Sequence, residues 1–166
     1  TKNDSSDSSQ KTYQGPSGSL ITNIKYQDKD RLICMYDDSI HLIANDKDEE
    51  LINNDNKKIY FLSIQLNNNI VSIEEKSSGL FTADSIVNIT NIDNKSQKTY
   101  MVEDVKKEIY TFENIIALNL GAEVEFINTN GDLVKRYIAN QEITNMVVSN
   151  SIAGIIYRDR IEIINL

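Results

Sequence analysis

The sequence of 166 residues carries a formal net charge of −8 and a single cysteine, Cys34. Nucleic-acid binding needs a basic stripe that neutralises phosphates, so the acidic balance excludes that class of partner. It also disfavours direct peripheral binding of this domain to anionic membranes. One cysteine excludes an internal disulfide framework, and the apolar run of residues 32–36 around it indicates a buried thiol.

The composition favours strands over helices. Isoleucine far outnumbers leucine and alanine, and the chain has eight tyrosines, one proline and no tryptophan. β-branched and aromatic residues suit a pleated, half-buried surface. The length suits one domain with a sizeable core, and no segment approaches the roughly 20 apolar residues of a transmembrane helix. The heavy use of Ile, Asn and Lys is typical of low-GC bacteria.

Residues 1–9, TKNDSSDSS, are predicted to be a flexible polar linker. A disordered terminus is the simpler interpretation. We favour a spacer downstream of a membrane anchor or signal segment outside this chain, because strand-like sequence begins directly afterwards. The predicted domain then covers residues 10–166.

Short apolar or alternating runs, separated by Asn, Asp and Gly, dominate the domain and predict an all-β protein. They group into four units, at residues 21–54, 58–103, 108–138 and 142–166. The strands expected in the first two units cover residues 21–26, 31–36, 39–45, 49–54, 58–66, 70–75, 85–92 and 97–103. Residues 76–84 are expected to form a loop.

The last two units repeat this plan until the fourth stops one strand short. Their expected strands cover residues 108–113, 115–120, 123–129, 133–138, 142–149, 153–158 and 160–166. An Asn-Gly pair at 130–131 predicts a hairpin turn. The phrase QKTY stands in the fourth strand of the second unit and again at residues 10–13. We therefore expect residues 10–14 to supply the missing strand and close the ring.

Four antiparallel strands per unit predict a repeat-built all-β fold, which we interpret as a small, four-bladed β-propeller closed by that N-terminal strand. The second strand of each unit is the most apolar, as expected for burial on both faces. The fourth is the most polar, as expected at an outer rim. A β-sandwich and the C-terminal part of a larger propeller are the alternatives.

The phrase VEFINTNGDLVKRY at residues 124–137, with the terminal IIYRDRIEIINL, resembles the blades of uncharacterised membrane-anchored β-propeller proteins of clostridia and related Firmicutes. The resemblance covers mainly residues 109–166. It implies an extracytoplasmic domain of the cell envelope, held by a single N-terminal anchor. It transfers no functional residue to this chain.

Residues that carry chemistry are sparse. His41 is the only histidine, and we expect it on an exposed strand face or between blades rather than as a ligand or base. Without a Cys/His cluster, a structural zinc site is excluded. Asp46, Asp48 and Glu50 alternate like the acidic ligands of a calcium-binding loop. The segment lacks the glycine and the closing glutamate of such a loop, which favours a solvated turn. A Ser-His-Asp arrangement stays open, although no nucleophile-elbow phrase is present. We predict no catalytic, cofactor-binding or metal-binding residue.

The longest interruption of the repeat is the best candidate for a contact site. Gly79, Leu80 and Phe81 are expected in this loop. Exposed apolar residues on a loop of a rigid scaffold suit a protein partner. The alternative is that Leu80 and Phe81 fold back and cap a blade.

These observations predict a non-catalytic protein-interaction or scaffolding domain of an extracytoplasmic envelope protein, with a partner of unknown identity. A carbohydrate-binding or hydrolytic propeller is one alternative, which the lack of tryptophan disfavours. A structural domain that assembles with copies of itself through unpaired edges is another.

Overall fold

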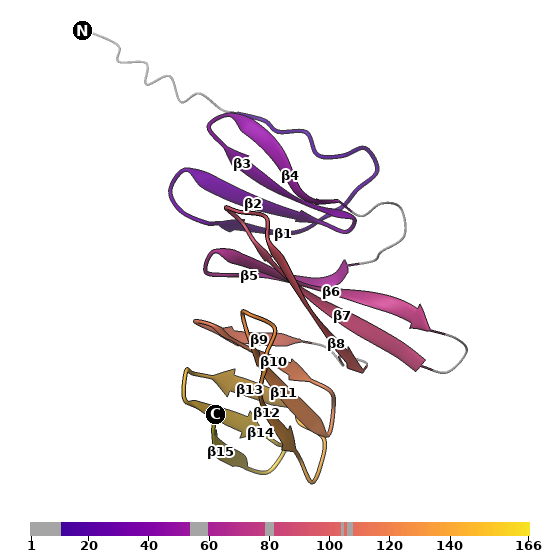
Figure 1. Ribbon diagram of the computed structural model, residues 1–166, viewed down its shortest axis with the longest axis vertical. Coiled ribbons are helices and arrows are strands. Elements are labelled where there is room, and N and C mark those ends of the chain that lie inside the picture. Colours follow the sequence, from indigo (N-terminus) through magenta and orange to yellow (C-terminus); the bar gives the residue numbers. More distant parts are fainter. Residues whose placement is uncertain (1–10, 54–59, 79–81, 104, 106–107) are drawn as a thin grey trace, which may run out of the picture.

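The computed structural model describes residues 11–53, 60–78, 82–103, 105 and 108–166 (Figure 1). The strands in these residues form four antiparallel sheets, which we name A to D in chain order. In this part of the chain, no helix is both long and apolar enough to cross a membrane.

Each sheet is a meander in which consecutive strands are hydrogen-bonded neighbours. Sheet A holds β1 (Ile21–Tyr26), β2 (Arg31–Tyr36), β3 (Ser39–Ala44) and β4 (Lys47–Asn53). Sheet B holds β5 (Tyr60–Leu66), β6 (Asn69–Ser78), β7 (Thr82–Asn91) and β8 (Gln97–Glu103). Sheet C holds β9 (Ile109–Phe112), β10 (Ile115–Asn119), β11 (Glu123–Asn128) and β12 (Leu133–Ile138). Sheet D holds β13 (Asn145–Val148), β14 (Ile152–Ile156) and β15 (Ile161–Asn165). The predicted order of strands from residue 21 onward is confirmed.

Two left-handed residues make the β3–β4 hairpin. Asn45 and Asp46 have φ values of 51° and 62°, the pair of positive angles that a two-residue type I′ turn requires. The acidic turn expected around residues 46–50 is therefore shorter than predicted. Asp48 and Glu50 lie in β4 and pair with β3.

The Asn-Gly turn predicted between β11 and β12 is confirmed. Gly131 has a φ of 84°, and its amide donates to the carbonyl of Asn128 at 2.9 Å. The side chain of Asn128 accepts hydrogen bonds from the amides of Asn130 and Asp132. Asparagine thus satisfies the turn's backbone donors, while glycine adopts the left-handed conformation at no steric cost.

The four sheets stack face to face in chain order, with A and D at opposite ends (Figure 1). The first strands β1, β5, β9 and β13 lie against one another in succession. Buried apolar side chains fill the junctions: Ile40, Leu42, Ile70 and Ile92 between A and B, Val71, Ile73, Ile116 and Leu118 between B and C, and Ala117, Phe126, Met146 and Ile155 between C and D. Central strands of B and C therefore bury both faces, because successive side chains point to opposite sides.

The A–B junction is more polar than the other two. Ser72 and Glu74 alternate with Ile70 on the face of sheet B that packs against sheet A, and Asn88 and Thr90 lie beside them. All four polar residues are buried. Asn88 donates to a carboxylate oxygen of Glu74 at 2.5 Å. This junction therefore removes less apolar surface from water.

The ring closure predicted from residues 10–14 is wrong for the described chain. Sheet D has three strands, and residues 11–14 form no strand. Lys11 instead donates to Asp46 of sheet A, and the Tyr13 hydroxyl lies 3.4 Å from the same carboxylate. Because sheet D stands at the far end of the stack, this segment cannot reach it. The repeated phrase indicated a kind of strand without specifying which sheet it joins.

The loop predicted over residues 76–84 is mostly strand. β6 and β7 pair Lys76 with Asp84 and Ser78 with Thr82, and this hairpin projects beyond the stack (Figure 1). The sequence concealed these strands because it is polar and does not alternate, whereas the pairing of strands is made by backbone groups. Residues 79–81 lie outside the described residues.

The predicted all-β fold of repeated antiparallel units is confirmed. A sandwich packs two sheets around one core, whereas these four sheets bury three junctions, so that alternative is wrong. Meander sheets that stack with their first strands side by side are arranged as the blades of a β-propeller. In the described chain the blades form an open stack.

Candidate functional site

The contact predicted at Gly79, Leu80 and Phe81 lies outside the described residues and stays a prediction. Two other places in the described chain gather polar side chains. One is a histidine cluster on sheet A, and the other is a cleft between sheets B and C.

His41 lies on the face of sheet A that points away from sheet B. Its Nδ1 is 2.8 Å from an oxygen of Asp48, and its Nε2 is 3.2 Å from the hydroxyl of Ser39. The Tyr36 ring meets the imidazole edge-on, with centroids 5.2 Å apart. His41 is buried but does not lie between blades, so neither predicted position, an exposed strand face or a blade interface, is confirmed.

The contacts run from Ser39 to His41 to Asp48, as in a catalytic Ser-His-Asp triad. The serine hydroxyl, however, is not accessible to a substrate. Ser39 is buried, and its hydroxyl donates to Asp38 at 3.1 Å. A nucleophile must reach the substrate and needs donors for the developing oxyanion. This cluster is better explained as a partly buried hydrogen-bond network that holds β3 to β4.

The other potential ligands in the described part of the chain do not form a metal site. Among the described residues, no group of three or more His, Cys, Asp or Glu side chains is arranged to hold a metal ion. Cys34 pairs across the strands with His41 and is buried, as predicted. Burial raises the pKa of its thiol, which lowers its reactivity.

A cleft of about 310 Å³ opens between β8 of sheet B and β11 and β12 of sheet C. Its lining includes Tyr100, Met101, Leu120, Glu123, Glu125 and Arg136. This volume is near the lower end of the range for ligand sites. The cleft therefore has room for one long side chain or a small polar molecule.

Glu125 is the centre of the cleft, although its side chain is almost fully buried. Its carboxylate accepts a hydrogen bond from Tyr100 at 2.8 Å, across the junction between the sheets, and others from Arg136. The guanidinium of Arg136 also lies 2.7 Å from Glu123. Pairing and hydrogen bonding make the buried charge tolerable. Two carboxylates share one guanidinium, so negative charge is in excess.

The pKa shifts in the cleft preserve these donors. Burial, reinforced by the hydrogen bond to Glu125, raises the pKa of Tyr100 to about 12. Its hydroxyl therefore keeps its proton at neutral pH and remains a donor. The hydrogen bonds to Glu125 also raise the pKa of Arg136, which stays charged.

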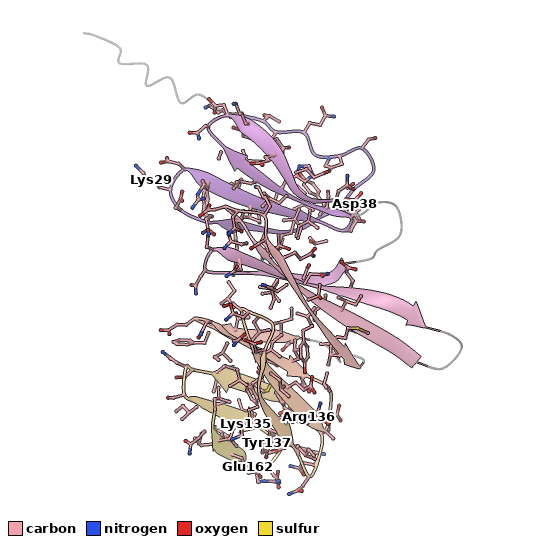
Figure 2. The ribbon with its side chains drawn as sticks, in the orientation of Figure 1. Lys29, Asp38, Lys135, Arg136, Tyr137 and Glu162 are labelled. Atoms are coloured by element: carbon pink, nitrogen blue, oxygen red, sulfur yellow. The ribbon has the colours of Figure 1, made fainter. Side chains whose placement is uncertain are left out.

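The same tyrosine-to-glutamate link joins sheets C and D. Tyr137 of β12 donates to Glu162 of β15, and Lys135 donates to the carbonyl of Asn165 (Figure 2). Burial of the Tyr137 hydroxyl raises its pKa. The signal was present in the repeated phrases EVEFIN and RIEIIN, whose glutamates match. It was missed because strand patterns do not show which side chains meet across sheets.

A second cleft, of about 300 Å³, lies where the N-terminal segment crosses sheet A. Lys11, Tyr13 and Asp46 line one side, and the apolar residues Leu32 and Ile43 line the other. This cleft opens on the face of sheet A that is remote from sheet B.

No family model and no curated protein matches this sequence. A solved structure of a protein of unknown function from Bacteroides caccae aligns with 92% of this chain and 63% of its own, at 14% identity and a TM-score of 0.51. BamB from Moraxella catarrhalis aligns with 80% of this chain and 39% of its own, at 12% identity and a TM-score of 0.46. Hsv2 from Kluyveromyces lactis aligns with 89% of this chain and 74% of its own, at 9% identity and a TM-score of 0.39.

The Bacteroides likeness supports the fold alone, because identity at this level transfers no function. The present chain spans 63% of that protein's length.

Proposed function

We propose that this domain is a non-catalytic interaction module that binds a protein partner through the cleft between sheets B and C. The observation that carries the proposal is the pair of carboxylates, Glu123 and Glu125, which share the single guanidinium of Arg136. The excess negative charge selects a cation. A lysine or arginine side chain of the partner supplies it.

The rest of the cleft suits the stem of such a side chain. Met101 stands at the cleft with 63% of its surface exposed, and Leu120 lines the wall. Long basic side chains lay their methylene groups along apolar surface while the charged end reaches polar partners. Tyr100 and Arg136 already hold the buried carboxylate of Glu125, so the more exposed Glu123 is the group that meets the partner.

The non-catalytic assignment is supported by the buried serine beside His41. The placement in a bacterial envelope, outside the cytoplasm, is supported by the polar linker at residues 1–9 and by the resemblance to anchored propeller proteins. Protease treatment of intact cells that express the full protein tests this placement. Digestion without lysis agrees with it, and protection of the domain until lysis contradicts it.

Binding is tested with two labelled peptides, tetra-lysine and tetra-glutamate, by fluorescence anisotropy. Tetra-lysine is expected to bind and tetra-glutamate is not. Glu123→Gln should weaken tetra-lysine about three- to thirtyfold, roughly 0.7–2 kcal/mol. The matched control is Glu142→Gln, which removes the same charge at an exposed site outside the cleft. Equal losses in both variants would show that net charge alone attracts the peptide, and the proposal would fail.

Carbohydrate binding is a second candidate, because the cleft also offers a tyrosine, two carboxylates and a guanidinium to sugar hydroxyls. A glycan array distinguishes the two. Binding to a defined glycan that Tyr100→Phe or Glu123→Gln abolishes would favour this candidate over a basic protein segment.

A further inference from the structure

Sheet D presents an apolar face that points away from sheet C. Val147, Ile152, Ile161 and Ile163 are exposed there, Ile163 by 67%. Within the described residues, β15 pairs with β14 alone, so its other edge is open. An apolar face beside an open strand edge is a typical site of association.

The same positions in sheet C are covered by the next sheet. Ala117 of β10 pairs with Phe126 of β11, and Gly154 of β14 pairs with Ile163 of β15. The two strand pairs therefore have the same register and can be aligned residue by residue. The counterparts of residues 152, 154, 161 and 163 are Ile115, Ala117, Val124 and Phe126, which pack toward sheet D and are at most 5% exposed. The outer face of sheet D is therefore built like a face that receives another sheet.

In sheets B and C, the outer strand contacts the third strand of the next sheet. In β12, Lys135 donates to the carbonyl of Asn165, the last residue of β15, and Tyr137 donates to Glu162. Tyr100 of β8 reaches β11 in the same way. A tyrosine of the outer strand thus holds the following sheet at both junctions, and in β12 a lysine two residues earlier adds a second hydrogen bond.

Residues 11–13 make a related contact on sheet A, again through a lysine and a tyrosine two residues apart. Lys11 donates to Asp46, in the turn after the third strand, and Tyr13 lies 3.4 Å from the same carboxylate. Gly15 then crosses directly over Tyr36, since a side chain on it would meet the tyrosine ring at 2.5 Å. The segment therefore occupies the position of the outer strand of a sheet that would precede A.

We infer that sheet D of one copy of this chain packs on sheet A of a second copy, with residues 11–14 of the second copy pairing with the open edge of β15. Within the described residues, sheet D at one end of the stack has three strands, and residues 11–14 at the other end hold the position of an outer strand beside sheet A. The two ends cannot meet within one chain, because they stand at opposite ends of the stack.

The geometry also limits the size of the assembly. A head-to-tail contact generates a ring if its rotation closes. Two copies joined by two identical junctions make a ring of eight blades, within the roughly four to eight that propellers use. The apolar side of the cleft on sheet A, with Leu32 and Ile43, faces the incoming sheet. This inference goes beyond the proposed function and leaves the cleft between sheets B and C untouched.

Light scattering after size-exclusion chromatography, at about 1 to 100 µM, measures the mass of the 166-residue chain in solution. A mass twice the 18.9 kDa of one chain is expected. Ile163→Lys should give monomers, because it places a charge in the apolar face. Ile138→Lys is the matched control and should remain dimeric, since Ile138 lies on the edge of sheet C and is 73% exposed, close to the 67% of Ile163. Circular dichroism verifies that both variants are folded.

A mixing experiment tests the head-to-tail arrangement itself. The double variant Lys11→Glu/Tyr13→Asp places acids beside Asp46 and should also be monomeric alone. Mixed with Ile163→Lys, it should form a heterodimer, because one intact junction remains between its sheet D and the other chain's sheet A. A wild-type monomer at the highest concentration overturns the inference. The inference is also overturned if the mixture does not associate, or if the double variant alone is still a dimer.

Discussion

Phe126→Ala should loosen sheet D while leaving sheet A unchanged. Phe126 is fully buried and is the largest such side chain in the described chain. It lies in the apolar cluster between sheets C and D. Removing a buried phenylalanine side chain costs about 3–5 kcal/mol. Sheets that touch only their neighbours behave as a one-dimensional array. The substitution should therefore lower the free energy needed to open sheet D and leave that of sheet A unchanged.

Native-state hydrogen exchange measures that opening. With about 1.4 kcal/mol per factor of ten, amides of β14 should exchange roughly 100- to 4,000-fold faster, while amides of β2 and β3 keep their rates. Phe112→Ala serves as the control, because Phe112 is an exposed phenylalanine of the same sheet, 40% accessible. It should change β14 exchange by less than about fivefold. Equal acceleration in β2 and β14 would refute the reasoning and show that the stack opens as one unit.

Three further outcomes are expected. The pKa of Tyr100 is raised from about 10 to about 12, so the free energy of unfolding should fall as pH rises between these values, and urea titrations should show a smaller fall in Tyr100→Phe. Gly131→Ala should cost about 1–2 kcal/mol in the same assay because of the positive φ; no loss would contradict the left-handed turn. Cys34 should react with a thiol reagent at least about tenfold more slowly in the native protein than in denaturant, and equal rates would contradict its burial.

Strand positions were largely predictable because the apolar residues of the central strands must alternate between two junctions. Runs such as IIALN and EVEFIN show this directly. The pattern failed at residues 76–84, where the strands extend beyond the stack and the sequence does not alternate between polar and apolar residues. It also failed for residues 10–14, since a repeated phrase identifies an outer strand without specifying its sheet.

The candidate site was less predictable than the fold. Glu125 and Arg136 pair directly across β11 and β12, and strand register alone suggests that pair. Tyr100 lies 25 residues earlier and meets Glu125 only because sheet B stacks on sheet C. The spacing of these residues along the chain carries no chemical signature, so the site emerges only from the stacking.

Under mechanical load along the stack, the junctions between sheets act as links in series. The A–B link excludes the least apolar surface, because sheet B turns Ser72, Glu74, Asn88 and Thr90 toward sheet A. It therefore ruptures at a lower force than the apolar link beside Phe126. A pull applied through the N-terminus detaches sheet A first and leaves sheets B to D, with their cleft, intact. The polar junction is therefore the place where the stack separates first under such a load.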